Sequence, residues 1–147
     1  MKRKQLLELL DDLRPHVGEE LKIVGSQAVH AVANLVPSIV ERSVECDLYL
    51  PVNPEKRQFL QTEFGLESEY QARKGVHADF MGRATVVLPK AWESRLVPIK
   101  DEDGLLRGYA AEIHDVAVSK LMASREKDYE FLRDCFQGTF FKGRSLG

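Results

Sequence analysis

Two carboxylates stand two positions apart in the apolar segment VECDLYLP (residues 44–51), at Glu45 and Asp47. Alternate residues of a strand point to the same face, so both side chains would lie on one face of a sheet. Like charges at this spacing repel unless a cation or solvent relieves them. Mg²⁺ takes one or two carboxylates and completes its shell with phosphate oxygens and water. The doublet therefore predicts a metal site beside a phosphate, and the alternative is a solvated strand end.

A glycine turn precedes the doublet. The apolar segment ELKIVG (residues 20–25) runs through Gly25-Ser26 into a helical pattern, SQAVHAVAN (residues 26–34). A strand, a glycine turn and a helix N-terminus leave backbone N–H groups where an anion can sit. Such turns are common, so a purely structural role is the alternative. Together with the doublet, the turn predicts a phosphate-binding corner.

Basic residues gather where two predicted helices meet, in HDVAVSKLMASREKDYEFL (residues 114–132). The residues concerned are Lys120, Arg125 and Lys127, with Asp128 beside them. Basic side chains collected at one junction can clamp a triphosphate. The alternative is a solvated face in which Asp128 pairs with Arg125 or Lys127.

Hydrophobic periodicity predicts the elements that must position these groups. Helices are expected at residues 2–14, 26–34, 54–64, 114–124 and 125–136, and strands at 20–25, 44–51 and 105–111. Residues 75–82 and 84–88 are expected to form two strands or a bent pair, and residues 90–99 a turn and another strand. A loop is expected after Pro37, and residues 20–25 and 44–51 are expected to be neighbours in the sheet. An apolar stripe of Val116, Leu121 and Met122 would dock the helix at 114–124 on that sheet. This order predicts an α+β fold in which helices pack on a mixed sheet, as one domain spanning residues 1–147.

Composition narrows the class of protein. The 147 residues, 44% of them apolar, suit one domain with a core. A net charge of −2 argues against a nucleic-acid coat, yet a local basic patch would still bind RNA or nucleotide phosphates. Cys46 and Cys135 form no CxxC pattern, so we interpret them as reduced thiols. No signal peptide and no membrane-spanning run is recognisable, so we expect a cytoplasmic protein without membrane contact.

Four motifs together resemble a bacterial family of nucleotidyltransferase-like proteins: GSQAVHA, SVECDLYL, ATVVLPKAWESRLVPI and HDVAVSKLMASREKDYEFL. That family is related to the AbiEii-type toxins of toxin–antitoxin systems and, more remotely, to the minimal nucleotidyltransferases. The resemblance runs from about Leu21 to Phe136, and the last motif is the most specific. It implies a nucleotidyltransferase-like fold for the chain.

The resemblance also implies roles for individual residues. Members of the superfamily hold nucleotide phosphates at a glycine turn, bind Mg²⁺ with paired carboxylates and contact the nucleotide through a basic cluster. By that likeness the matching positions are Gly25 and Ser26 for the turn, Glu45 and Asp47 for the catalytic metal pair, and Lys120, Arg125, Lys127 and Asp128 for the cluster.

The third catalytic carboxylate of the superfamily has no motif here. Asp79, in GVHADFMG, is the first candidate and Asp128 the second. Glu45 also stands where active relatives usually have aspartate, and the extra domain of larger toxins is missing. These departures favour a catalytically inactive member of the superfamily over an active enzyme.

Two functions follow from the resemblance. The first is an Mg²⁺-dependent transfer of a nucleotidyl group from a nucleoside triphosphate to a hydroxyl of RNA, a protein or a small molecule. Such an enzyme would fit the toxin of a toxin–antitoxin pair, with a separate antitoxin as partner. The second is a catalytically inactive nucleotidyltransferase fold that serves as a binding or regulatory module. The glycine turn and the basic motif favour the enzyme, whereas the departures favour the inactive module.

Overall fold

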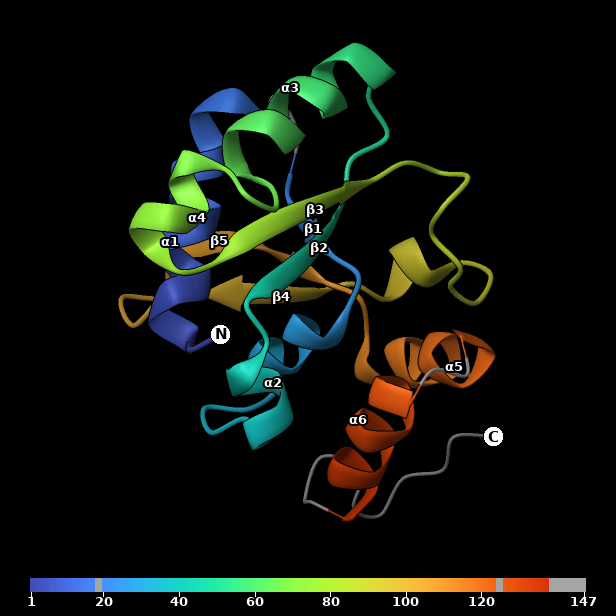
Figure 1. The fold of residues 1–147 in the computed structure, drawn as a ribbon. Coiled ribbons are helices and arrows are strands. Elements are labelled where there is room, and N and C mark those ends of the chain that lie inside the picture. Colours follow the sequence, from blue (N-terminus) through green and yellow to red (C-terminus); the bar gives the residue numbers. More distant parts are fainter. Residues whose placement is uncertain (18–19, 124–125, 138–147) are drawn as a thin grey trace.

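A five-stranded mixed sheet organises the protein (Figure 1). The computed structural model describes residues 1–17, 20–123 and 126–137. The strands lie in the order β3-β2-β1-β5-β4. Their bounds are β1 Lys22–Ile23, β2 Glu45–Tyr49, β3 His77–Met81, β4 Val97–Lys100 and β5 Leu106–Ala110. Strands β1 and β2 pair antiparallel, which confirms the predicted neighbours, and the α+β class is confirmed as well.

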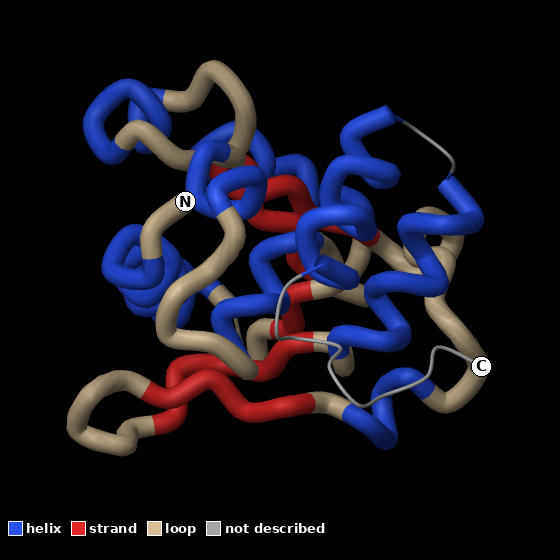
Figure 2. The backbone as a smooth tube through the Cα atoms, turned by 90° about the horizontal axis from the view of Figure 1, so that it is seen from below, coloured by secondary structure: helices blue, strands red, loops and turns tan. Residues whose placement is uncertain are grey.

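Helices pack along the band of strands, as the view from below also shows (Figure 2). They are α1 Arg3–Leu13, α2 Ser38–Arg42, α3 Pro54–Phe64, α4 Glu69–Lys74, α5 Ile113–Ala123 and α6 Glu126–Gln137. Short 3₁₀ helices cover Arg14–His16, Ser26–Ala31 and Trp92–Arg95. Helices α5 and α6 lie together at one end of the molecule, away from α3 and α4 (Figure 1). Among the described residues, none of the helices has the length and apolar character that a membrane crossing requires.

The helices form where their sequences carry start and stop signals. In α1, four leucines on one face are fully buried in the core: Leu6, Leu9, Leu10 and Leu13. Helix α3 begins after Asn53, whose side-chain oxygen accepts a hydrogen bond of 2.8 Å from the Lys56 N–H. Helix α4, which the sequence analysis missed, is capped by Ser68 in the same way.

The parallel pair of β2 and β3 sets up the site. Helices α3 and α4 connect the two strands, and residues 45–49 pair in register with residues 77–81. Asp47 is therefore the direct partner of Asp79. Cys46 and Leu48 are fully buried, so the intervening Glu45 and Asp47 face the opposite side of the sheet. The two strands bring carboxylates that are distant in sequence to one place.

Three predicted elements differ from the structure. The strand expected at residues 84–88 does not form, because the N–H and hydroxyl of Thr85 both bond to the Gly82 carbonyl and turn the chain. The loop expected after Pro37 contains the short helix α2. The helix expected at residues 26–34 is a six-residue 3₁₀ helix, Ser26–Ala31, in which the Ala28 N–H donates to the Gly25 carbonyl.

The predicted apolar stripe of α5 is wrong in two of its three positions. Val116 is fully buried, but Leu121 is 46% exposed and Met122 is 64% exposed. Helix α5 docks instead through its first turns, with Ile113, Val116 and Ala117 buried. Its last turn therefore presents apolar side chains outward, next to the lysine at position 120.

Candidate active site

Three carboxylates form a cluster on strands β2 and β3. One oxygen from each of Glu45, Asp47 and Asp79 lies within 4.8 Å of the others. All three side chains are half-buried. Carboxylate oxygens gathered this closely are the ligands that hard divalent cations such as Mg²⁺ and Ca²⁺ take in proteins. The donor set therefore fits such a cation.

The electrostatics of the cluster favour a cation at its centre. Burial raises the pKa of Asp47 to about 6, and repulsion by Glu45 and Asp79 adds to the shift, while Lys120 and Lys127 oppose it. Burial likewise raises the pKa of Asp79, and the charge of Glu45 adds to the effect. Both shifts mean that the ionised carboxylates are disfavoured where they stand. A bound divalent cation would reverse that penalty.

Gly25 makes room for the cluster. A Cβ on Gly25 would lie 2.5 Å from the Oδ2 atom of Asp47, closer than non-bonded atoms can approach. The strands hold this arrangement, because the Val24 N–H donates a 3.0 Å hydrogen bond to the Asp47 carbonyl. Ser26 follows at the start of the 3₁₀ helix and lines the same pocket as the carboxylates. The predicted phosphate contacts of Gly25 and Ser26 stay predictions.

Lys120 comes to the cluster from α5, held by a buried partner on α6. Its Nζ atom lies 3.2 Å from Oδ1 of Asp128, and the side chains are 13% and 0% exposed respectively. The same ammonium lies 5.7 Å from the centre of the Phe131 ring. Asp128 therefore pairs with Lys120, a partner that the sequence analysis did not consider.

One pocket of about 170 Å³, called the acidic pocket below, brings the predicted residues together. Its lining includes Ser26, Glu45, Asp47, Asp79, Lys120, Lys127 and Asp128. Lys127 is exposed, so its ammonium can reach a ligand without leaving an ion pair in the core. The predicted Arg125 lies outside the described residues.

His77 belongs to this neighbourhood and was missed at the sequence level. It is the register partner of Glu45, and its Nε2 atom lies 3.9 Å from Oε1 of Glu45. Its side chain is buried, and its Nδ1 atom has no hydrogen-bond partner among the described residues. The available signal was the spacing of His77 and Asp79, which repeats the two-residue spacing of Glu45 and Asp47.

The comparison with protein families decides the class of the chain. The sequence model of a family described as "Nucleotidyltransferase of unknown function (DUF6036)" matches residues 2–136. The chain belongs to this family. The predicted nucleotidyltransferase superfamily is thereby confirmed, and the match includes every residue of the acidic pocket. No curated protein and no solved structure matches the chain significantly.

For a nucleotidyltransferase, the arrangement of charges is chemically apt. The transferred phosphate needs positive charge on one side and a metal held by carboxylates on the other. Helices α5 and α6 supply the ammonium groups, and strands β2 and β3 supply the carboxylates. The site thus lies where the helical pair meets the sheet.

Proposed function

We propose that the protein is an Mg²⁺-dependent nucleotidyltransferase, which moves a nucleotidyl group from a nucleoside triphosphate to an acceptor hydroxyl. The observation that supports this most is the acidic pocket, in which three close carboxylates share one lining with Lys120 and Lys127. A solvated strand end does not explain three half-buried carboxylates that come from two strands and lie within 4.8 Å of one another. The family match supports the same activity.

Glu45 and Asp47 hold the metal in this proposal, with Asp79 as a further ligand or as the base. Bound Mg²⁺ supplies neutralisation of phosphate charge and orientation of the reacting oxygens. Gly25 lets the Asp47 carboxylate stand against the backbone of the neighbouring strand. The metal pair is therefore positioned by backbone geometry as well as by its own strand.

Lys120 and Lys127, with Ser26, hold the phosphates. The ion pair with Asp128 holds the Lys120 ammonium in a buried position, where its charge acts at lower dielectric than in water. Arg125 joins this cluster in the proposal on the strength of its sequence motif alone.

The proposed reaction exchanges one oxygen–phosphorus bond for another and moves one proton. The acceptor oxygen attacks the α-phosphorus, a new oxygen–phosphorus bond forms, and the bond to the departing pyrophosphate breaks. The hydroxyl proton passes to a carboxylate, for which Asp79 is the candidate because it stands opposite Asp47 on the next strand, within the same cluster.

The acceptor is a hydroxyl on RNA, on a protein or on a small molecule. The sequence likeness to AbiEii-type toxins supports a role as a cytoplasmic toxin of bacteria that a separate antitoxin controls. In this proposal residues 1–147 act as one catalytic domain.

A ligand titration tests the proposal. The thermal midpoint of the protein should rise with Mg²⁺ and a nucleoside triphosphate together, because a ligand that binds the native state stabilises it. Incubation with α-labelled triphosphates and a panel of RNA, protein and small-molecule acceptors should then label one acceptor. Glu45→Gln should abolish both signals, whereas the exposed loop variant Asp103→Asn should preserve them.

Two outcomes would contradict the transferase. If Mg²⁺ and a nucleoside triphosphate together leave the thermal midpoint unchanged, the proposed binding site does not exist. Stabilisation without labelling of any acceptor, or of the protein itself, would favour the inactive binding module.

A further inference from the structure

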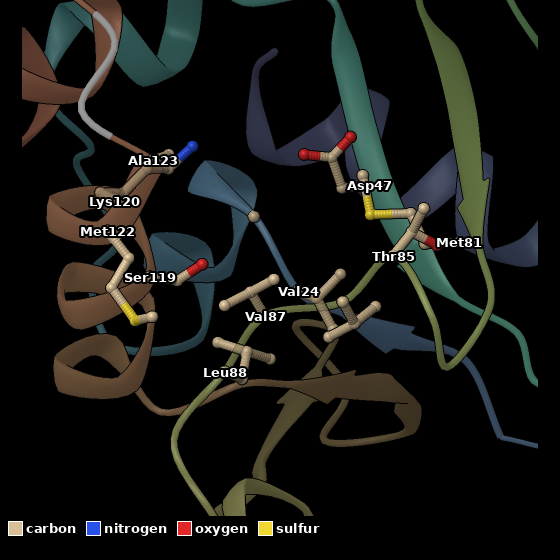
Figure 3. A pocket seen from close by; sticks show the side chains of 12 residues that line it. Val24, Asp47, Met81, Thr85, Val87, Leu88, Ser119, Lys120, Met122 and Ala123 are labelled. Atoms are coloured by element: carbon tan, nitrogen blue, oxygen red, sulfur yellow. The ribbon is translucent and has the colours of Figure 1, made fainter.

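A second pocket of about 370 Å³, called the apolar pocket below, adjoins the acidic pocket. The two pockets share Asp47, Met81 and Lys120 in their linings. The other side chains on its walls are mostly aliphatic and come from the residue after β1, the segment after β3 and the last turns of α5: Val24, Val86, Val87, Leu88 and Met122. In Figure 3 the head groups of Asp47 and Lys120 face each other across one end of this pocket.

The apolar pocket is unsuited to phosphate. Apart from Asp47 and Lys120, its polar side chains are the hydroxyls of Thr85 and Ser119. Away from Lys120, these neutral hydroxyls and the aliphatic side chains offer an anion no positive charge to pair with. A flat group with apolar faces and a few polar edges fits such walls, with hydroxyls able to donate or accept at its rim.

We propose that the apolar pocket holds the nucleoside part of the donor triphosphate. The phosphates pass between Asp47 and Lys120 into the acidic pocket, so one molecule spans both pockets. This inference rests on the proposed nucleotidyl transfer, and it adds the direction in which the donor lies. It also assigns the base contacts to Val87, Leu88 and Met122.

The residues that line the two pockets indicate which pocket holds the donor and which side the acceptor approaches from. A nucleoside is joined covalently to the phosphate that reacts, so its pocket must open directly onto the metal ligands. The apolar pocket does so through Asp47 and Lys120. Asp79, the proposed base for the acceptor hydroxyl, lines only the acidic pocket. The acceptor therefore approaches from the Asp79 side, and the apolar pocket is left for the donor.

Two side chains that the core does not bury support this assignment independently. Met122 is 64% exposed and Val87 is 53% exposed, although both lie beside a charged site. Neither packs in the core, because α5 docks through its first turns and the segment after Thr85 leaves the sheet. A base lying between them would cover apolar surface that otherwise faces water.

Filling the pocket separates its role from that of the acidic pocket. Ala123, an exposed residue at the end of α5, lines the apolar pocket but not the acidic one. Ala123→Trp should weaken ATP binding by about ten-fold or more in calorimetry with Mg²⁺, since contacts to one base are worth about that much. Inorganic triphosphate with Mg²⁺, which carries no nucleoside, should bind as it does to the parent.

Matched variants complete the test. Ala72→Trp, at an exposed alanine on α4, should leave both ligands unaffected. Lys127→Ala should weaken both ligands, because both carry the phosphates. Unchanged ATP affinity in Ala123→Trp would overturn the inference, and a concurrent loss of transfer would place the acceptor in this pocket. Failure of the proposed function would show differently, as a parent protein that binds neither ATP nor inorganic triphosphate, and that result would overturn the inference too.

Discussion

Gly25 and Asp47 are packed so closely that the carboxylate occupies the space of the missing side chain. A Cβ at residue 25 would lie 3.2 Å from both Cβ and Cγ of Asp47, and 2.5 Å from its Oδ2. The φ angle of Gly25 is −120°, which any residue can adopt. The requirement for glycine is therefore one of space, imposed by the Asp47 side chain on strand β2.

Gly25→Ala should displace the Asp47 carboxylate and weaken Mg²⁺ or Mn²⁺ binding by about ten-fold or more. Stability should fall by about 1–3 kcal/mol, the usual cost of a small overpacking. Isothermal calorimetry and urea unfolding measure the two effects. Gly82→Ala is the matched control, because the nearest atoms to its Cβ would belong to the Arg57 guanidinium, at 3.0 Å, and not to a carboxylate of the cluster. Equal metal affinity in both variants would show that Gly25 does not position the ligand.

Asp47→Asn should stabilise the metal-free protein. The pKa of Asp47 rises from 3.8 to about 6 on folding, so between these values the native state binds more protons than the unfolded state. Stability therefore falls as pH rises through that window, and the full cost persists above it. At pH 7.5 we expect Asp47→Asn to gain roughly 1–3 kcal/mol in unfolding free energy while losing metal binding.

Urea unfolding in chelator at pH 4 and pH 7.5 checks this sign. The variant should show less loss of stability between the two pH values than the parent does. Asp103→Asn, in the exposed turn between β4 and β5, should match the parent at both. A variant less stable than the parent at pH 7.5 would mean that the carboxylate makes a favourable contact in the empty pocket.

Asp79→Asn should show whether Asp79 acts as the base or as a metal ligand. If Asp79 accepts the acceptor proton, its loss should lower turnover by about 10²–10⁴-fold with little change in nucleotide affinity. Steady-state kinetics and calorimetry with Mg²⁺ and nucleotide measure the two quantities. A collapse of metal affinity would instead make Asp79 a ligand, and unchanged turnover would exclude both roles.

Lys120→Met should destabilise the protein strongly, by about 3–5 kcal/mol, because it removes the ammonium group that lies 3.2 Å from the fully buried carboxylate of Asp128. Asp128→Asn should lower the unfolding free energy by less, because the Lys120 ammonium still interacts with the carboxylate of Asp47. The double variant should recover much of the loss of the first. Urea unfolding of the four proteins measures this coupling. Additive losses would mean that the ion pair contributes no coupling.

Lys127→Ala should leave stability within about 0.5 kcal/mol, because the side chain is exposed. Nucleotide affinity should fall by about ten-fold at low salt, and the difference from the parent should shrink as salt rises. Lys4→Ala, at an exposed lysine of α1, is the control. A salt-independent loss would point to a change of structure in the pocket.

Much of this site could be predicted from the sequence, because the motifs that form it are local. The i, i+2 spacing of Glu45 and Asp47 fixes their common face in any strand, and the leucines of α1 predict a buried helix in any fold. The partner of Asp47 on β3 depends on the register of a parallel pair, which is set by tertiary packing across a long crossover. Asp79 could therefore be named as a candidate but not placed.

The elements that were predicted wrongly also depend on contacts that a local sequence pattern does not encode. Thr85, Val86 and Val87 have high strand propensity, yet hydrogen bonds from Thr85 to the Gly82 carbonyl end the sheet before them. Leu121 and Met122 fit a helical stripe by spacing alone, but the buried apolar residues of α5 are Ile113, Val116 and Ala117, in its first turns. The pairing of Lys120 with Asp128 requires the angle between two helices, which no local pattern encodes.

The order of the site's parts along the chain has a consequence for its biosynthesis. The three carboxylates are translated by residue 79, whereas Lys120, Lys127 and Asp128 come from α5 and α6. On the ribosome, strands β2 and β3 can pair before either ammonium group has emerged. The nascent chain then holds the three carboxylates without Lys120 and Lys127, so under the proposed function it could gather a metal ion before it could hold the phosphates of a nucleotide.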